Sequence, residues 1–293
     1  MKPLLGLGTA QFGLEYGIAG GAKVSPNEAG QMIAVAALNG VKVIDTASQY
    51  GNALEVLSKH KRIMARKSMR IILKIPHIPE KITFDVIANV RDQIFADLNR
   101  LGVSHVDTLM VHNPQAFIGP GSELVYDLLL NFKYAGYCDK IGVSVYTPAE
   151  FFDILQLYPV DVVSIPNSYI DQSFNQHLDV IRAFGVEIHT RSIFLQGALV
   201  MPLHDVHHLG WQFRTSRRKV LRGFEGDALA GALDYLKKQD AVHHGIIGAN
   251  SYNELEETII KYHEPPTEFR FRGLQIRNQK VIDPREWKNG SSS

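Results

Sequence analysis

The 293-residue sequence predicts an α/β protein with the architecture of a TIM barrel, in which eight parallel strands alternate with helices. Three observations support this fold class. Short apolar runs typical of buried strands recur eight times, stretches with helical periodicity lie between them, and no linker-like segment divides the chain. Such alternation indicates parallel strands joined by crossover helices, and eight units favour a closed barrel over an open sheet. We therefore expect residues 1–293 to form a single (β/α)8 domain.

The expected strands follow one another along the whole chain. They are Leu4–Gly8, Val41–Ile44, Ile71–Ile75, Val106–Val111, Cys138–Val143, Val162–Ile165, Val186–His189 and Gly245–Ile247. Between the third and fourth strands, an apolar residue recurs every three or four positions, as on the buried stripe of a helix: Phe84, Ile87, Val90, Ile94 and Leu98. Three segments resemble the capping boxes that begin helices: Ser25–Glu28, Thr147–Glu150 and Ser251–Glu254.

One connection is much longer than the others. About thirty residues, Gln196 to Gly226, separate the seventh strand from its helix, against a usual two to six. We expect a functional loop over the barrel mouth, because such loops carry binding residues. Its basic run Arg214–Lys219 is either a solvated surface or an arm that reaches a ligand's phosphates. The tail after Pro265 has no clear periodicity, and we expect Ser291–Ser293 to be frayed.

Composition points to small-molecule chemistry in a reducing compartment. A net charge of +1 provides no general field for nucleic acid or an anionic membrane, so neither partner is expected. Cys138 is the only cysteine, which excludes an intramolecular disulfide, and we expect it to be a small buried residue. The apolar run at the start of the chain is too short for the hydrophobic region of a signal peptide. We therefore expect cytoplasmic localisation. We expect polar loops and no metal at the histidine groups His204, His207, His208 and His243–His244, which lack further ligands at suitable spacing.

Four polar residues follow or end neighbouring strands: Asp45, Tyr50, Lys74 and His112. Taken singly, each has an ordinary structural explanation, such as a cap, a packed aromatic ring, a surface lysine or a core histidine. Barrel enzymes keep their active sites at the carboxyl ends of the strands, so these four should meet. A tyrosine with a pKa near ~10 donates a proton poorly unless a cation such as Lys74 stabilises its phenolate. Asp45 would hold Lys74, and His112 would orient a substrate oxygen.

This set, with Gly51 after Tyr50, resembles the catalytic pattern of the aldo/keto reductase superfamily. The resemblance continues in Leu5–Thr9, Ile141–Ser144, Arg191–Gly197 and Ile246–Ala249. It implies reversible reduction of an aldehyde or ketone, with hydride from NADP or NAD in reduced form and a small-molecule carbonyl substrate. The sequence of Arg191–Gly197 resembles that of a bacterial branch of the family associated with polysaccharide or sugar metabolism, which suggests a sugar-derived carbonyl. No protein partner is implied.

The resemblance also implies which residues contact the cofactor. Ser144 would touch the nicotinamide carboxamide, Arg191 would flank the ring, and Ser192 with residues 248–258 would hold the phosphates and adenosine. The family often has asparagine and glutamine where this chain has Val145 and Ser164, so carboxamide contacts are expected to be fewer or replaced. The full set is Gly8, Thr9, Asp45, Ser144, Ser164, Arg191, Ser192, Phe194, Gln196, Gly197, Gly248, Ala249, Asn250, Glu254, Glu257 and Thr258.

Two questions stay open at the level of sequence. Glu254 either accepts a ribose hydroxyl, which favours NAD, or completes the capping box that Ser251 begins. Arg217, Arg218 or Lys219 could supply a charge for the 2′-phosphate of NADP, so we expect dual cofactor use. A nicotinamide-binding regulatory subunit with little turnover is the alternative to an enzyme, and the intact set of four polar residues favours the enzyme.

Overall fold

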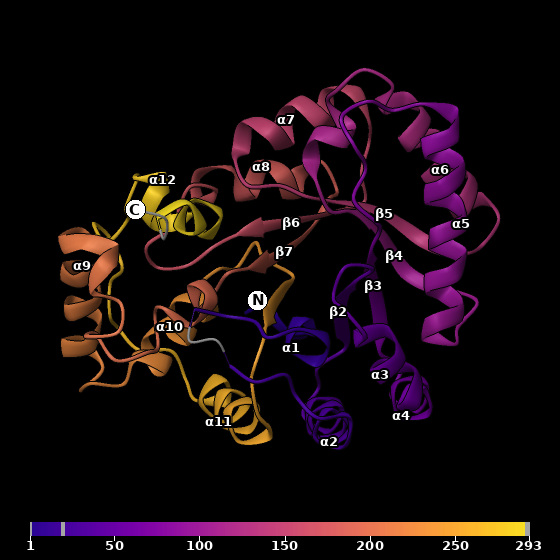
Figure 1. Cartoon of the computed structure of the whole chain (residues 1–293). Helices are drawn as coiled ribbons and strands as arrows, with labels where there is room; N and C mark the ends of the chain where they lie inside the picture. The colour runs from indigo at the N-terminus through magenta and orange to yellow at the C-terminus, as the bar shows by residue number, and fades with distance from the viewer. Residues whose placement is uncertain (1, 19–20, 291–293) are drawn as a thin grey trace.

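The computed structural model describes residues 2–18 and 21–290 and shows a closed barrel of eight parallel strands surrounded by helices (Figure 1). The strands are β1 (Leu4–Gly8), β2 (Val43–Ala47), β3 (Arg70–Lys74), β4 (Val106–Val111), β5 (Cys138–Ser144), β6 (Val162–Pro166), β7 (Glu187–Arg191) and β8 (His244–Ile247). Each strand pairs with the next, and β8 closes the barrel on β1. The predicted fold class, strand number and strand order are therefore confirmed, with bounds shifted by a few residues.

Helices between the strands form the outer layer of the barrel. They are α2 (Pro26–Leu38), α3 (Ala53–Lys59), α4 (Lys61–Arg66), α5 (Phe84–Leu101), α6 (Ser122–Tyr134), α7 (Pro148–Leu157), α8 (Leu178–Ala183), α10 (Ala228–Lys237) and α11 (Tyr252–His263). In α5 the predicted stripe is buried at Val90, Ile94 and Leu98, whereas Phe84, the first residue, is 78% exposed. The buried stripe thus begins later than predicted.

The three predicted helix starts all have a capping side chain. Thr147 and Glu150 form a complete capping box at α7. The Ser25 hydroxyl accepts the N–H of Glu28, but the Glu28 carboxylate accepts the N–H of Tyr252 at 2.9 Å instead of closing its own box. Glu28 therefore links the start of α2 to the start of α11, and this link is a tertiary contact that local sequence does not encode.

Side chains fill the barrel interior in layers, as β3 illustrates. Its inward residues are two positions apart: Arg70 at the amino end, Ile72 in the middle and Lys74 at the carboxyl end. The middle layer is an apolar cluster of buried residues: Val43, Ile72, Met110, Val162 and Ile246. This cluster separates the ionisable groups at the mouth of the barrel from those at the opposite end.

The connection between β7 and α10 is folded and is not the loop we predicted. It contains η3 (Leu195–Gly197), η4 (His207–Leu209) and the fourteen-residue helix α9 (Gly210–Gly223). Val206, Leu209 and Phe213 are buried in a second core cluster because their spacing brings them to one face. The tail after Pro265 joins this cluster through residues that include Phe271, and it ends in α12 (Gln279–Ile282) and η5 (Pro284–Gly290).

Other predictions concern the termini and single residues. Ser291–Ser293 lie outside the described residues, as does the side chain of His207. Cys138 is buried at the start of β5, as predicted, and burial raises the pKa of its thiol to about 11. Within residues 2–18 and 21–290, every helix is too short or too polar to cross a membrane.

Candidate active site

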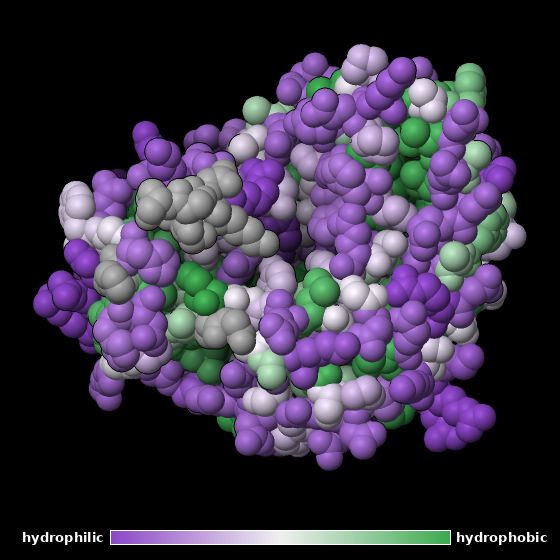
Figure 2. Space-filling view, in the orientation of Figure 1, coloured by the Kyte–Doolittle hydropathy of each residue, from purple (hydrophilic) through white to green (hydrophobic). Residues whose placement is uncertain are grey.

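A cavity of about 730 Å³ lies at the carboxyl ends of the strands. Polar residues on or shortly after β1, β2, β3, β4, β5, β7 and β8 line it. The face of the molecule seen in Figure 2 is hollowed near its centre, and hydrophilic side chains surround the hollow. The structure brings to this cavity nearly all the residues predicted from the sequence: Gly8, Thr9, Asp45, Tyr50, Lys74, His112, Ser144, Arg191, Ser192, Phe194, Gln196, Gly197, Gly248, Ala249, Asn250, Glu254, Glu257 and Thr258.

Ser164 is the exception, and its contact with a cofactor stays a prediction. It lies on β6, is 1% exposed, and does not line the cavity. It is two residues from Val162 of the apolar layer, so it shares the inward face of the strand, but its short side chain does not reach the cavity. Its hydroxyl has no hydrogen-bond partner among the described residues.

Asp45, Lys74 and Tyr50 form a continuous polar contact. Lys74 ends β3 and is 3% exposed, and its ammonium forms an ion pair with the carboxylate of Asp45, which is 4% exposed. On its other side, Lys74 Nζ donates to Tyr50 Oη at 3.4 Å. A turn after β2 holds Tyr50, whose backbone N–H donates to the carbonyl of Ala47. Ala47 is also the register partner of Lys74, so the strand pairing itself brings the lysine and the tyrosine together.

The charges in this group determine its protonation. Burial raises the pKa of the Tyr50 phenol, and the neighbouring Lys74 ammonium opposes that rise. Burial alone would lower the pKa of Lys74, but the Asp45 carboxylate reverses this and holds the pKa above its ordinary value. At neutral pH the site therefore contains a protonated tyrosine beside a fixed cation. That pair can release a proton to a bound base and stabilise the phenolate left behind.

His112 follows β4 and lies edge-on to Tyr50, with ring centroids 6.2 Å apart and an interplanar angle of 86°. Burial lowers the pKa of His112 to about 3, and the charges of Lys74 and Arg191 add to this effect. The imidazole is therefore neutral at physiological pH. A neutral imidazole can donate one hydrogen bond to an oxygen that Tyr50 also approaches.

Arg191 ends β7 and connects the ends of two strands. Its Nε donates to the Ser144 hydroxyl at 3.3 Å, and its Nη2 donates to the Val145 carbonyl at 2.9 Å. Its guanidinium carbon lies 4.2 Å from the ring centroid of Tyr146, and that of Arg285 lies 3.3 Å from the same centroid. Tyr146 lines the cavity, and Arg285 contacts it from outside the lining; neither was predicted from the sequence. Tyr146 was detectable as the second residue after Ser144, whereas Arg285 contacts Tyr146 only because the C-terminal segment folds back.

The segment after β7 has unusual backbone geometry. Ser192, Leu195 and Gln196 have φ values of 58°, 48° and 53°, in the left-handed region that non-glycine residues rarely adopt. Such strain persists where surrounding contacts enforce it, and it is common at functional sites. Here the Gln196 carbonyl accepts the N–H of Ile18 at 3.0 Å, so the segments after β1 and β7 meet across the mouth.

The far end of the cavity is formed by the segment after β8 and the start of α11. The Glu254 carboxylate accepts from Asn250 twice, from the backbone N–H at 2.8 Å and from Nδ2 at 3.2 Å, while Ser251 caps Glu254. Glu254 therefore caps the preceding turn and lines the cavity as well. A side chain at Gly248 would lie within 2.6–3.1 Å of the Gln11 amide, so the glycine permits close approach. Gln11 and Tyr16 also line the cavity, and neither was predicted from the sequence.

The basic run Arg214–Lys219 belongs to helix α9 and not to a loop. Arg217 is 2% exposed and lines the cavity, whereas Arg218 and Lys219 are exposed to solvent. Because residues on one helix point in different directions, the run is neither wholly a solvated surface nor wholly a ligand arm. Of these three residues, the structure places only Arg217 at the cavity.

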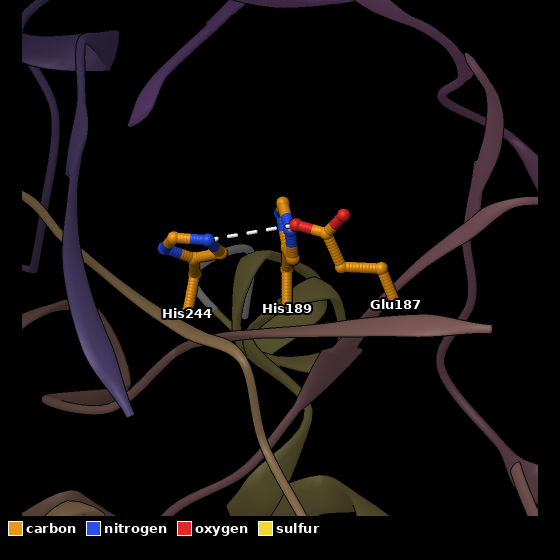
Figure 3. A group of neighbouring side chains, drawn as sticks. All are labelled: Glu187, His189 and His244. Carbon is orange, nitrogen blue, oxygen red and sulfur yellow. Dashed lines mark hydrogen bonds and ion pairs between the residues drawn. The ribbon is translucent and has the colours of Figure 1, made fainter. Parts of the chain in front are cut away.

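A second ionisable cluster lies at the amino ends of the strands. Glu187 and His189 lie on β7 and His244 begins β8 (Figure 3), with possible ligand atoms within 4.8 Å of one another. His244 is 3% exposed, so the predicted polar loop at His243–His244 is wrong at this residue. It belongs to an inward-facing strand position two residues before Ile246 of the apolar layer.

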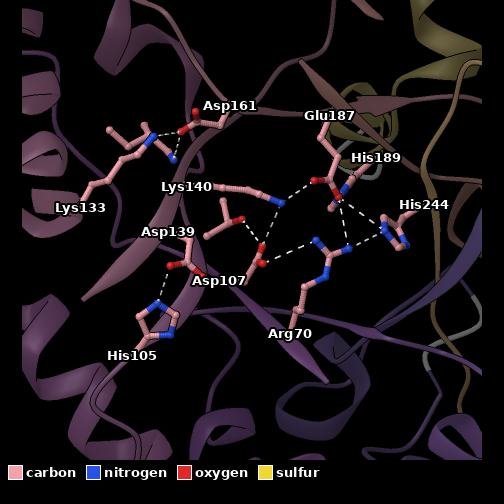
Figure 4. A network of polar contacts seen from close by, with 12 residues as sticks. Arg70, His105, Asp107, Lys133, Asp139, Lys140, Asp161, Glu187, His189 and His244 are labelled. Atoms are coloured by element: carbon pink, nitrogen blue, oxygen red, sulfur yellow. Dashed lines mark hydrogen bonds and ion pairs between the residues drawn. The ribbon is translucent and has the colours of Figure 1, made fainter. Parts of the chain in front are cut away.

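The side chain of Arg70 contacts two of the three residues that could otherwise bind a metal ion in this cluster. Arg70 Nη2 donates to His244 Nε2 at 2.7 Å and to Glu187 at 3.3 Å, and Lys140 donates to Glu187 at 2.6 Å (Figure 4). Burial alone would raise the pKa of Glu187, but hydrogen bonds from His189 and Lys140 hold it below its usual range. The cluster therefore links neighbouring strands to one another at their amino ends.

Comparison with known proteins agrees with the fold. A family model described as "Aldo/keto reductase family" matches residues 4–269. Two curated relatives are an NADH-specific methylglyoxal reductase of Escherichia coli, 24% identical over 55% of this chain and 54% of that protein, and an aldo-keto reductase of Mycobacterium ulcerans, 27% identical over 49% and 48%. The chain thus spans about half the length of these relatives.

Solved structures resemble the chain over most of its length. An aldo-keto reductase of Bacillus halodurans in its holo form has a TM-score of 0.72 at 16% identity, covering 90% of this chain and 87% of that one. A thermostable aldo-keto reductase bound to the inhibitor epalrestat has a TM-score of 0.66 at 19% identity, covering 91% and 92%. At such identities the likeness supports the fold alone, whereas the family model covers most of the chain. On that match, the chain belongs to the aldo/keto reductase family.

Proposed function

We propose that this chain catalyses the reversible reduction of a small aldehyde or ketone by NADH or NADPH, with Tyr50 as the proton donor. One observation carries the proposal: Lys74 lies between the Asp45 carboxylate and the Tyr50 hydroxyl in a cavity that also holds His112. Proton donors of ordinary pKa are inefficient at carbonyl oxygens unless the resulting anion is stabilised. The buried Lys74 ammonium provides that stabilisation.

Each residue of this group has one part in the proposed mechanism. The carbonyl oxygen accepts hydrogen bonds from Tyr50 and from the neutral His112, which orient it. As negative charge develops on that oxygen, Tyr50 transfers its proton there, and the phenolate is held by Lys74. Asp45 keeps Lys74 charged and in place. In the reverse direction, the phenolate accepts the proton of the alcohol.

The cavity suits a dinucleotide on three grounds. Its volume of about 730 Å³ lies within the range of small-molecule and cofactor sites. It extends from Tyr50 to Thr258 of α11 and is lined by Asn250, whose buried Oδ1 has no partner among the described residues. Ser144 and Arg191 would hold the carboxamide end, and residues 248–258 the adenosine end. When bound, the nicotinamide supplies the hydride to the carbonyl carbon.

We infer that the substrate is a small polar carbonyl. The Escherichia coli relative is named as a methylglyoxal reductase specific for NADH, which supports a 2-oxoaldehyde and the use of NADH by this chain. The sequence resemblance to a branch associated with sugar metabolism supports a sugar-derived carbonyl of similar polarity. Both classes present an oxygen-rich group beside the reacting carbon.

The proposal is tested by assaying a panel of carbonyls with each cofactor. Methylglyoxal, simple aldoses and an aromatic aldehyde are incubated with NADH or NADPH, and cofactor oxidation is followed by absorbance. We expect turnover of at least one polar carbonyl. Tight cofactor binding without turnover on any carbonyl would contradict the proposal and support a nicotinamide-binding regulatory subunit.

A further inference from the structure

The guanidinium of Arg191 is held in a fixed plane at the wall of the cavity. Its Nε donates to the Ser144 hydroxyl at 3.3 Å, its Nη1 to the Ser192 hydroxyl at 3.4 Å, and its Nη2 to the Val145 carbonyl at 2.9 Å. Its central carbon lies over the ring of Tyr146, 4.2 Å from the centroid. Because oxygens of the chain surround its edge and an aromatic ring covers one face, Arg191 presents a flat, charged face to the cavity that it lines.

The charge of Arg191 is not used up by its contacts. Its hydrogen-bond acceptors among the described residues are two hydroxyls and a carbonyl, all of them neutral. Asp283 is near enough for its pKa to respond to Arg191, but Arg285 donates to both of its carboxylate oxygens at 3.0 Å. A guanidinium stays charged at neutral pH. Arg191 therefore brings a lasting positive charge to the cavity.

This charge lies beside the proposed reaction centre. Burial is the main cause of the low pKa of His112, and the charges of Lys74 and Arg191 add to it. Burial raises the pKa of Tyr16, which also lines the cavity, and the Arg191 charge opposes that rise. Hydride transfer needs reacting atoms about 3–3.5 Å apart, so a hydride-bearing ring must lie in the part of the cavity next to Tyr50. Arg191 therefore acts on the charge of that ring.

We propose that Arg191 makes the site selective for the reduced form of the nicotinamide cofactor, so that the chain retains NADH or NADPH and releases the oxidised form. The oxidised ring carries one positive charge that the reduced ring lacks. A fixed cation repels the oxidised ring, whereas the flat face of a guanidinium packs against the uncharged reduced ring.

The inference rests on the proposed function for the identity of the ligand and deepens it by assigning a direction. Selective retention of the reduced cofactor favours reduction of the carbonyl over oxidation of the alcohol. In that direction a hydride, with its two electrons, goes to the carbonyl carbon and a proton from Tyr50 goes to the carbonyl oxygen. The oxidised cofactor is then released, and its release is aided by the repulsion from Arg191.

The test measures the dissociation constants of NADH and NAD⁺ by calorimetry in the wild type, Arg191→Met, Arg191→Lys and Arg66→Met. Arg66 is exposed at the end of α4, so Arg66→Met controls for the loss of one positive charge from the protein. The quantity compared is the dissociation constant of NAD⁺ divided by that of NADH. Loss of packing or of hydrogen bonds weakens both forms, whereas loss of the local charge changes this ratio.

We expect a wild-type ratio of at least about ten, and a ratio in Arg191→Met that is lower by about tenfold or more. For a two-electron couple, a tenfold change corresponds to about 30 mV in the reduction potential of the bound cofactor. Arg191→Lys keeps the charge without the planar group, and Arg66→Met removes a remote charge. Both should retain the wild-type ratio to within about threefold.

Three results would overturn the inference. They are a wild type that binds NAD⁺ as tightly as NADH, a ratio that Arg191→Met leaves unchanged, and a ratio that falls equally in Arg191→Met and Arg191→Lys. The last result would assign the effect to the shape of the guanidinium and not to its charge. The first is measured on the wild type alone, so the test holds even if Arg191→Met does not fold.

Failure of the proposed function gives a different pattern. The expected ratios without reduction of any carbonyl would contradict the enzyme proposal and leave the inference standing. Turnover of a carbonyl by a protein whose ratio does not depend on Arg191 would overturn the inference and leave the enzyme proposal standing.

Discussion

At the scale of single residues, the proposed chemistry of the site depends on one buried cation between two oxygen groups. Lys74 contacts the Asp45 carboxylate on one side and lies 3.4 Å from the Tyr50 hydroxyl on the other. The ion pair is what keeps a buried lysine charged, since burial alone would lower its pKa. Changes to Lys74 should therefore act on the reaction through the pKa of Tyr50.

Lys74→Met should lower kcat by about 10²-fold and move the pH profile of the remaining reduction upward. Without the cation, burial raises the pKa of Tyr50 still further, so the phenol stays protonated to higher pH. The measurement is kcat/KM from pH 6 to pH 10 in both proteins. In the wild type, kcat/KM should not change with pH between neutral pH and about pH 5, because the pKa of His112 is about 3. An unchanged alkaline limb in the variant would remove Lys74 from the mechanism.

Glu254→Arg should shift cofactor selectivity toward NADPH. The carboxylate faces the cavity and would repel a 2′-phosphate, while an arginine there would bind it. We expect dual use in the wild type and a change of at least about tenfold in the ratio of kcat/KM for the two cofactors. Glu256→Arg is the control, because Glu256 lies on the same helix and contacts Tyr252 at 2.7 Å. If both variants left the ratio unmoved, Glu254 would be only a cap for Asn250.

At the scale of elements, sequence patterns predicted what local periodicity encodes and missed what depends on distant contacts. The eight strands were recognisable because each is a short apolar run between turn signals. Helix α9 was not, because its mean composition is polar and its buried face is completed by residues such as Phe271 from the tail. Arg285 contacts Tyr146, which lines the cavity, only because the tail folds back.

The segment between β7 and α10 should therefore contribute to stability as well as to binding. Phe213 of α9 is fully buried, and Phe213→Ala should lower the free energy of unfolding by about 3–5 kcal/mol through loss of burial and creation of a cavity. Trp211, two residues away on the same helix and 68% exposed, gives the matched control Trp211→Ala, which should change stability little. Denaturant unfolding measures both. Equal, small effects would show that α9 is a mobile cover and not part of the core.

At the scale of the whole molecule, an apolar layer inside the barrel separates two ionisable groups with different tasks. The group at the carboxyl ends of the strands lines the cavity, and the group at the amino ends pairs Arg70, Lys140, Glu187 and His244 with one another. Such a division allows chemistry at one end while the other end holds strands together. It predicts that the amino-end cluster affects stability more than activity.

The pH dependence of unfolding tests this division. Burial lowers the pKa of His244 to about 3, with His189 and Arg70 adding to the effect. Below the unfolded pKa of about 6.5, the unfolded chain binds a proton that the folded chain does not, so stability falls toward acid by up to about 1.4 kcal/mol per pH unit. His244→Gln should reduce that slope between pH 6.5 and pH 4, and His263→Gln, at an exposed position, should not. Parallel slopes in wild type and His244→Gln would contradict the assignment.

The central claim is that Tyr50 donates the proton to the substrate carbonyl, and single-turnover reduction by Tyr50→Phe tests it most directly. The variant removes one oxygen and should keep the fold and the dissociation constants of NADH and NADPH. We predict that the rate of hydride transfer to a reactive 2-oxoaldehyde falls by about 10²–10⁴-fold, the range of general acid catalysis. Tyr134→Phe, at a residue that is 81% exposed, should react as the wild type. A Tyr50→Phe protein that binds cofactor and reduces the carbonyl at the wild-type rate would contradict the account.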